Sequence, residues 1–473
     1  MIKDLRDFIE GCRKSDDLKE ITAEVDWNLE ASHIAKLNEE KKGHALLFSN
    51  IKGYESPIFM SALSTPHRLG LALGTKERES IVGMAREWVG LTQKGLIPPK
   101  VVENGPVTEN TIKGDDVDIL AKFPIPQFYP LDGGRYIGTT GFLVTQDPDT
   151  GWTNLGTYRM QVLDKNHIGV QILKGKHAGL ILDKYRKMGK KMPVAAVVGT
   201  DPILFLLSST TVGAGVSEYD VAGALRGQPI EVIKSDLTGL LIPATAEIVL
   251  EGEMDPNELR EEGPFGEYTG YYSGSSKGEF KKEFFKVTRI LHRNNPIFWG
   301  TSVGKPITDT HMLGALQVSA SLWSDLEDAK VPGIKGVYCL PEATGRMWSV
   351  ISVKISYPGH GMHVGTAAVG SSSGHYRMKG FIIVDDDIPA DDLSKVFWAL
   401  GVRFDPERDT HIITKTRSTP LDPSLPIDER MVGSKIIMDA TIPYEWEEKP
   451  IEIQLDEETV KKVQKRWKEY GLA

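Results

Sequence analysis

Apolar residues recur at helical spacing in several separate segments of the chain. This spacing predicts helices over residues 1–12, 28–41, 75–94, 177–191, 217–226, 308–326, 390–402 and about 457–470. The last helix carries an apolar stripe made of Val460, Val463, Trp467 and Tyr470, with Asp456 as its N-cap. So large an apolar face on a terminal helix predicts docking, either on its own domain or on a neighbouring copy in an oligomer.

Shorter apolar runs between turn residues predict strands. They fall at residues 45–48, 58–60, 142–144, 158–162, 168–172, 194–198, 204–207, 246–250, 284–291, 349–353 and 381–384. A proline-rich, irregular stretch from about 98 to 136 precedes the β-rich part, and such backbone inside a compact domain is usually functional. The helix at 308–326 connects to a second set of strands and helices. We therefore expect a mixed α/β (α+β) fold with a separate C-terminal α/β domain.

Length and composition limit the class of protein. A chain of 473 residues, 40% hydrophobic and 26% charged, predicts a globular protein of two or three domains. Its net charge of −9 argues against nucleic-acid binding. Cys12 and Cys339 form no metal or redox motif, which fits a reducing cytoplasm. The first residues do not form a signal-peptide pattern, and the apolar tract 193–207 is too short and interrupted to span a membrane.

The segment from Glu262 to Tyr272 is the strongest candidate for chemistry. Glu262 and Glu267 stand five residues apart, separated by Gly-Pro-Phe-Gly. Pro264 fixes its own φ and the glycines reach angles closed to other residues, which predicts a rigid loop. Two carboxylates held close titrate apart, so that one is ionised and the other can carry a proton. A solvated acidic turn is the alternative, but such turns seldom hold four aromatic residues in eight positions.

Familiar nucleotide and hydrolase motifs are missing or out of context. Neither a dinucleotide-binding G-x-G-x-x-G nor a P-loop occurs. G-x-S-x-G occurs at 274–278 and 370–374, with Ser276 and Ser372 as candidate nucleophiles. Both copies lie in Gly/Ser-rich loops followed by strand-like sequence, whereas a nucleophile elbow needs a strand before it and a helix after it. The context therefore disfavours a serine hydrolase.

Asn154, His177 and Glu218 are polar residues near predicted turns or helix starts. Taken singly, each has an ordinary structural explanation. Asn154 suits a turn, a lone histidine such as His177 is usually a surface or core residue, and a carboxylate such as Glu218 stabilises a helix N-terminus. Spacing alone does not join these three residues into one site.

Several motifs, in order along most of the chain, resemble the UbiD family of reversible decarboxylases, which use prenylated FMN. The loop Glu262-Gly-Pro-Phe-Gly-Glu267-Tyr-Thr-Gly-Tyr carries the resemblance first. The other motifs are Asn154-Leu-Gly-Thr-Tyr-Arg159-Met-Gln, Ser217-Glu218-Tyr-Asp-Val-Ala-Gly-Ala-Leu-Arg-Gly, Pro243-Ala-Thr-Ala-Glu-Ile-Val-Leu-Glu-Gly252, Tyr357-Pro-Gly-His360-Gly, Asp385-Asp-Asp387, Arg403-Phe-Asp-Pro-Glu-Arg-Asp409 and Gly433-Ser-Lys435.

The resemblance implies a particular domain organisation. Residues 1–305 would form the prenylated-FMN-binding catalytic domain, with a split β-barrel core at about 115–300. Residues 306–328 would form a linker helix, and 329–473 a C-terminal α/β oligomerisation domain with its terminal helix. A homodimer or higher homo-oligomer is expected.

By resemblance, Arg159, Glu262 and Glu267 match the family's catalytic Arg-Glu-Glu set. Arg159 would hold the substrate carboxylate or the flavin by paired hydrogen bonds, and Glu262 would orient Arg159. Glu267 would deliver the proton that replaces carbon dioxide on the substrate carbon. The implied reaction passes through a covalent adduct with the modified flavin, and it can run in reverse as a carboxylation.

The resemblance also implies metals. Asn154, His177 and Glu218 match the positions that bind a divalent ion, usually Mn²⁺ or else Mg²⁺, which bridges the protein to the cofactor phosphate. K⁺ near that phosphate is usual in the family, and Lys354 resembles a phosphate-side lysine. A flavin prenyltransferase is the implied supplier of the cofactor.

The substrate is less defined. Family substrates are aromatic, heteroaromatic or α,β-unsaturated acids. Tyr268, Lys176, His311 and His360 are candidate pocket residues, and their polarity favours a phenolic or heteroaromatic acid. Two alternatives stay open, namely a polyprenyl-4-hydroxybenzoate decarboxylase of ubiquinone-type synthesis and a cofactor-binding protein without activity.

Overall fold

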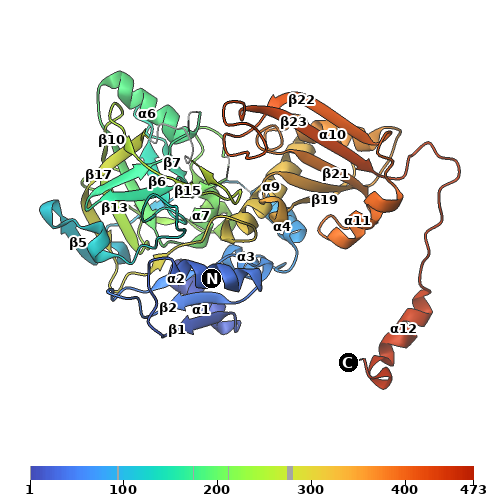
Figure 1. Ribbon diagram of the computed structural model, residues 1–473, viewed down its shortest axis with the longest axis horizontal. Coiled ribbons are helices and arrows are strands. Elements are labelled where there is room, and N and C mark those ends of the chain that lie inside the picture. Colours follow the sequence, from blue (N-terminus) through green and yellow to red (C-terminus); the bar gives the residue numbers. More distant parts are fainter. Residues whose placement is uncertain (1, 93–94, 174, 211, 274–280, 473) are drawn as a thin grey trace.

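The computed structural model describes residues 2–92, 95–173, 175–210, 212–273 and 281–472. Two lobes lie side by side, with helix α9 (Asp309–Asp328) between them (Figure 1). The N-terminal helices and the large antiparallel sheet form one lobe. A smaller sheet forms the other, which we call the C-terminal lobe. The mixed α/β fold predicted from the sequence is confirmed.

Three N-terminal strands and one strand from near residue 300 build a small sheet. Its strand order is β1 (Leu18–Ile21), β2 (Ala45–Phe48), β3 (Ile58–Met60) and β18 (Phe298–Trp299). Its neighbouring helices are α1 (Leu5–Lys14), α2 (Glu30–Glu40), α3 (Pro66–Leu73) and α4 (Ile81–Thr92). The predicted helix at 75–94 corresponds to α4 alone. Helix α3 was missed, although Thr65 caps it and Gly74 ends it in the left-handed conformation.

The large sheet is antiparallel and forms the centre of the first lobe. Its order is β7 (Thr153–Gly156), β6 (Phe142–Gln146), β10 (Met192–Val198), β13 (Ile248–Met254), β17 (Lys281–His292), β9 (His167–Val170) and β8 (Met160–Asp164). The long strand β17 also pairs with β5 (Asn110–Lys113) and β14 (Arg260–Glu261). Through β17, segments far apart in the sequence reach one sheet.

Shorter elements complete this lobe. The proline-rich stretch is divided into short pieces, namely β4 (Lys100–Val101), η1 (Pro106–Thr108), β5, η2 (Gly114–Asp116) and α5 (Ile119–Lys122). Strand β4 joins β11 (Glu231–Lys234) and β12 (Leu241–Pro243) in a small sheet. The helices α6 (His177–Met188) and α8 (Glu218–Arg226) form where the sequence predicts them.

The strand predicted at 204–207 is wrong, because these residues belong to helix α7 (Pro202–Ser208). Every residue of α7 is buried, so its apolar run shows no helical periodicity. The sequence signal for this helix lies at its first residues instead. Asp201 accepts a hydrogen bond from the Ile203 amide at 3.0 Å, and Pro202 occupies the first turn.

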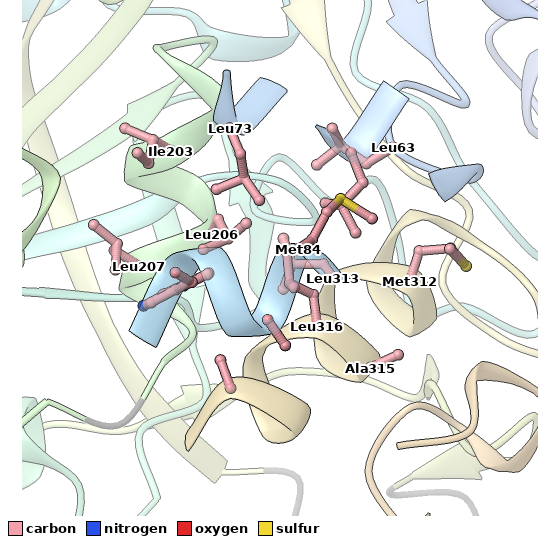
Figure 2. Close-up of a cluster of buried hydrophobic side chains, with 14 of the residues drawn as sticks. Leu63, Leu73, Met84, Ile203, Leu206, Leu207, Met312, Leu313, Ala315 and Leu316 are labelled. Carbon is pink, nitrogen blue, oxygen red and sulfur yellow. The ribbon is translucent and has the colours of Figure 1, made fainter. Parts of the chain in front are cut away.

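Helix α9 joins the hydrophobic cores of the two lobes. Its residues Met312, Leu313, Ala315 and Leu316 belong to one buried cluster with side chains of α4 and α7 (Figure 2). The same cluster continues into the C-terminal lobe. At the start of α9, the Asp309 carboxylate accepts hydrogen bonds from the backbone amides of Ala62 and Leu63 at 3.0 and 2.9 Å. The helix is therefore a packed structural element and not a free linker.

The C-terminal lobe is built on one mixed sheet. Its order is β19 (Ile334–Cys339), β20 (Trp348–Val353), β21 (Gly380–Asp385), β23 (Val432–Ala440) and β22 (Thr410–Arg417). The three central strands β20, β21 and β23 run parallel, and each edge strand is antiparallel to its neighbour. Its other elements are η3 (Pro341–Ala343), α10 (His360–Gly370) and α11 (Leu393–Val402). Parallel strands with helical crossovers match the α/β pattern predicted for this part.

The C-terminal segment extends away from both lobes (Figure 1). Ile451, Ile453 and Leu455 are exposed, with 95%, 95% and 82% of their surface open to solvent. Helix α12 (Glu457–Lys465) and the turn η4 (Trp467–Tyr470) follow, and no residue of either is buried. Among the described residues, no helix is long and apolar enough to cross a membrane.

Candidate functional site

The segment around Glu262 and Glu267 is a hairpin. Strand β15 (Phe265–Gly266) pairs with β16 (Tyr272–Ser273), and the Glu267 amide donates to the Tyr271 carbonyl at 3.1 Å. This hairpin directly follows β14, which is anchored on the long strand β17. The rigid loop predicted from the sequence is therefore held at both ends by backbone pairing.

Neighbouring polar groups fix the loop in place. Asp132 accepts a hydrogen bond from the Gly266 amide at 2.9 Å, and Gln161 accepts one from the Gly263 amide at 2.7 Å. Gly133 lies so close to the loop that a Cβ atom there would sit 1.9 Å from the Gly263 carbonyl oxygen. Only glycine permits this approach, which explains the Asp-Gly-Gly sequence at this point.

Arg159 lies between the two glutamates. Its Nε and Nη2 atoms donate to the Glu262 carboxylate at 2.9 and 2.6 Å, which is a paired, side-on contact. Its Nη1 atom donates to Glu267 Oε1 at 2.7 Å. The Ser273 hydroxyl donates to the same Glu267 oxygen at 2.9 Å and accepts from Arg159. The side chains of Arg159, Glu262 and Glu267 are 7%, 0% and 9% exposed, so this is a buried charge cluster.

Burial and neighbouring charges set the protonation of this cluster. Burial raises the pKa of Glu267, and the negative charge of Glu262 adds to that rise, although Arg159 opposes it. Burial by itself would lower the pKa of Arg159. The negative charges of Glu267 and Glu262 outweigh this effect, so the Arg159 pKa is raised. Asp132 behind the loop has a pKa raised to about 6 by burial. The guanidinium thus stays charged, while Glu267 is the carboxyl that can carry a proton.

Glu267 stands in the wall between two cavities. One cavity has a volume of about 450 Å³, and its lining includes Arg159, Glu267 and Tyr268. The other has a volume of about 550 Å³, and Glu267 and Ser273 are part of its lining. A carboxyl in this position can exchange a proton with either side.

Asn154, His177 and Glu218 line the first cavity together. They come from β7 and from the first residues of α6 and α8. His177 Nδ1 and Asn154 Oδ1 are 3.1 Å apart, and the Leu155 amide donates to Glu218 Oε2 at 2.7 Å. The fold therefore gathers an imidazole, an amide oxygen and a carboxylate that the sequence left separate.

The chemistry of this set fits a divalent cation. Glu218 is 2% exposed and makes no ion pair with the described residues, and burial raises its pKa to about 7. Burial lowers the pKa of His177, which favours the neutral imidazole that binds metals. A cation between these ligands would supply the positive counter-charge that the buried Glu218 carboxylate lacks.

Only some of the candidate pocket and phosphate-side residues reach the first cavity. Lys176 and Tyr268 line the first cavity, but His311, His360 and Lys354 are not among the lining residues. His311 is buried behind the pocket, where its Nε2 contacts the Tyr268 carbonyl oxygen at 2.7 Å. Burial lowers its pKa to about 3, so it acts as a neutral support. His360 begins α10 and stacks on the Tyr357 ring, and the side chain of Lys354 is exposed.

The structure also adds cavity residues that sequence reasoning missed. Ser273 follows the predicted loop directly and contacts both Glu267 and Arg159. The C-terminal lobe contributes Arg346, Tyr376, Arg377 and Arg417 to the first cavity. No local motif marks these arginines. Arg346 faces Tyr268 of the other lobe, and Arg417 faces Tyr376 from a separate segment of the same lobe.

The structure around Ser372 does not support the serine hydrolase alternative. Helix α10 precedes this G-x-S-x-G and strand β21 follows it, which reverses the order of a nucleophile elbow. The Ser372 hydroxyl donates to both oxygens of Asp325, at 2.8 and 2.9 Å. The second copy, with Ser276, lies outside the described residues.

Family models match three parts of the chain. The model of the 3-octaprenyl-4-hydroxybenzoate carboxy-lyase N-terminal domain matches residues 9–88, the Rift-related domain of the same family matches 100–306, and its C-terminal domain matches 311–440. Together these models cover well over half of the sequence.

Solved structures match the whole fold. HmfF, a UbiD-class enzyme from Pelotomaculum thermopropionicum solved in complex with FMN, is 30% identical with a TM-score of 0.87, over 97% of this chain and 98% of that one. The closed form of vanillic acid decarboxylase from Sedimentibacter hydroxybenzoicus is 32% identical with a TM-score of 0.86, over 100% of both chains. The 3,4-dihydroxybenzoic acid decarboxylase of Klebsiella pneumoniae is 25% identical with a TM-score of 0.83, over 97% and 99%.

Replacing Arg159 tests whether it neutralises the buried carboxylates. Arg159→Met leaves Glu262 and Glu267 buried without their cation, so we expect the free energy of unfolding to fall by about 3–5 kcal/mol at pH 8. The loss should be smaller at pH 5, because protonation of Glu267 removes a buried negative charge. Denaturant unfolding at both pH values measures this. The control Ser273→Ala should cost about 1 kcal/mol at either pH. An equal loss for Arg159→Met at both pH values would contradict the account.

Proposed function

Because the chain belongs to the UbiD family of carboxy-lyases, we propose that it catalyses the reversible, non-oxidative decarboxylation of an aromatic, heteroaromatic or α,β-unsaturated carboxylic acid. The observation that carries this proposal is the buried Glu262–Arg159–Glu267 cluster at the cavity wall. It combines a fixed guanidinium, which can bind a carboxylate, with a carboxyl group that can deliver a proton.

Each side chain has a separate task in this reaction. Glu262 holds Arg159 side-on through two nitrogens and so orients the guanidinium toward the cavity. Arg159 attracts the substrate carboxylate and positions it for loss as carbon dioxide. The electron pair left on the substrate carbon then takes the proton of Glu267, and a C–H bond replaces the C–C bond. Glu267 regains a proton from water in the second cavity, which the same residue lines.

The proposed cofactor is prenylated FMN, held with Mn²⁺ or Mg²⁺ and with K⁺. Asn154, His177 and Glu218 would hold the divalent ion beside the cofactor phosphate. When bound, the modified flavin supplies the electron sink that decarboxylation needs, while the protein supplies position and the proton. A structural relative solved with FMN and a form of it solved with the prenylated flavin support this choice. A flavin prenyltransferase would supply the cofactor.

The proposed substrate is an aromatic or heteroaromatic acid with a polar substituent. Tyr268 and Lys176, which line the cavity, can hydrogen-bond such a group. The vanillic acid and 3,4-dihydroxybenzoic acid decarboxylases among the structural relatives act on acids of this kind, which supports the proposal.

Glu267→Gln tests the proton donor. Glutamine keeps the size of the side chain but carries no acidic proton, so we expect turnover to fall by at least about 10²-fold while the flavin stays bound. Turnover by the unaltered protein should also decline as pH rises, because Glu267 must be protonated to donate. The measurements are product formation and flavin absorbance. The control Glu261→Gln removes an exposed charge nearby and should leave turnover unchanged. Full activity in Glu267→Gln would rule out this role.

We also propose that the C-terminal segment binds a second copy of the chain. Its exposed apolar residues include Ile451, Ile453 and Leu455, whose alternation suits an added strand, together with the apolar side chains of α12 and η4. Removing residues 456–473 should lower the number of chains per particle, as light scattering measures it, while the thermal unfolding temperature of the lobes changes little. An unchanged number of chains per particle would show that this helix plays no part in assembly.

A further inference from the structure

Asp132 is a buried carboxyl group behind the catalytic hairpin that none of the proposed reaction steps uses. It is 6% exposed and is not among the lining residues of either cavity. Throughout the described part of the chain, no lysine, arginine or histidine forms an ion pair with it. Burying a carboxyl group without a cation costs stability, so its position calls for another explanation.

Each oxygen of Asp132 accepts one backbone amide. Oδ1 accepts from the Gly266 amide at 2.9 Å, and Oδ2 accepts from the Tyr129 amide at 3.0 Å. Gly266 ends β15 and directly precedes Glu267. The carboxyl group therefore joins the catalytic hairpin to residues 129–136, which we call the support segment, at the position next to the proposed proton donor.

The support segment is itself fixed to the hairpin. The Gly133 amide donates to the Pro264 carbonyl oxygen at 2.8 Å. Packing is tight here, because a Cβ atom at Gly266 would lie 2.7 Å from the Tyr129 ring. A change in the contact between this carboxyl group and the Gly266 amide therefore acts directly on the hairpin.

Protonation of Asp132 would disturb its double contact. Both of its partners are N–H groups, which donate and cannot accept a hydrogen bond. An ionised carboxyl group accepts at both oxygens, whereas a protonated one carries an O–H group at one of them. That O–H group would face an amide donor, so one of the two contacts is weakened.

The surroundings of Asp132 let it change charge near neutral pH. Burial raises its pKa to about 6, while the two amide bonds and the charge of Arg159 act in the opposite direction, and the negative charge of Glu267 adds to the rise. Its charge also acts on three phenols, those of Tyr129, Tyr136 and Tyr272. Burial raises the pKa of each phenol, so all three stay neutral when the carboxyl group titrates.

We propose that Asp132 is a positioning residue whose ionised carboxyl group holds Gly266, and with it Glu267, in the place from which the proton is delivered. When Asp132 takes up a proton, the hairpin loses this support. Turnover then requires an ionised Asp132 together with a protonated Glu267, so it passes through a maximum and declines at low pH as well as at high pH. This inference rests on the proposed function, since it names a pH control of the same site.

The Gly266 amide reports this contact without any turnover. Phe265-Gly266 is the only Phe-Gly step in the sequence, so labelling with ¹³C-carbonyl phenylalanine and ¹⁵N-glycine gives a single NMR signal for this amide. We expect its proton shift to titrate with a midpoint at about pH 6 in the full chain. Asp132→Asn should abolish the titration, whereas Glu267→Gln should keep it, because Glu267 does not accept from this amide.

The pH profile of turnover gives the second readout. Asp132→Asn places an amide nitrogen where an acceptor is needed, so it resembles the protonated state at every pH. We expect its maximal turnover to fall at least about tenfold and its decline at low pH to disappear, while the flavin stays bound and the decline at high pH remains. Asp115→Asn removes an exposed carboxylate and should change neither readout.

Other results would overturn the inference. A Gly266 signal that does not titrate in the unaltered chain would do so even if Asp132→Asn failed to fold. A titration that persists in Asp132→Asn, or one that is lost in Glu267→Gln, would assign the proton to another group. A decline of turnover at low pH that survives in Asp132→Asn would also refute the role. Absence of turnover with every acid, alongside the expected Gly266 titration, would refute the decarboxylase and confirm the Asp132 contact.

Discussion

A buried guanidinium between two carboxylates is the constraint on which the site depends. Arg159 bonds Glu262 and Glu267 at 2.6–2.9 Å, and all three side chains are almost completely withdrawn from water. Buried charges are tolerated only when their partners are well placed. The hairpin of β15 and β16, the Asp132 bond to the loop and the Gly133 contact all serve to place them. Loss of any of these would leave charge in a low-dielectric interior.

The same arrangement lets the Glu267 carboxyl give up a proton on one side and recover it on the other. Glu267 faces the cavity that holds the metal-binding candidates and also the cavity lined by Ser273. A group in such a wall can give a proton to one side and recover it from the other. Burial raises its pKa, which favours the protonated form that can donate. Helix α9 then matters for chemistry, because it packs the two lobes together and so brings the arginines of the C-terminal lobe into the first cavity.

Much of the fold could be predicted from the sequence, since most elements carry a clear periodicity. Helix α7 could not, because a fully buried helix reads as a continuous apolar run. Glu262 and Glu267 stood out through their spacing in the Gly-Pro-Phe-Gly loop, whereas Arg159 and the metal candidates were found through the resemblance to the UbiD family. Asn154, His177 and Glu218 meet only because β7, α6 and α8 converge. Arg346, Arg377 and Arg417, which line the first cavity from the C-terminal lobe, had no sequence signal, since they lie in separate segments of the chain.

The most direct test of the central claim is the identity of the cofactor. We would purify the chain from cells that also express a flavin prenyltransferase, and record the absorbance spectrum, the mass of the released flavin and the metal content. The account predicts a flavin with the additional prenyl-derived ring and about one Mn²⁺ per chain. A well-folded protein that holds neither the modified flavin nor a divalent metal would contradict it.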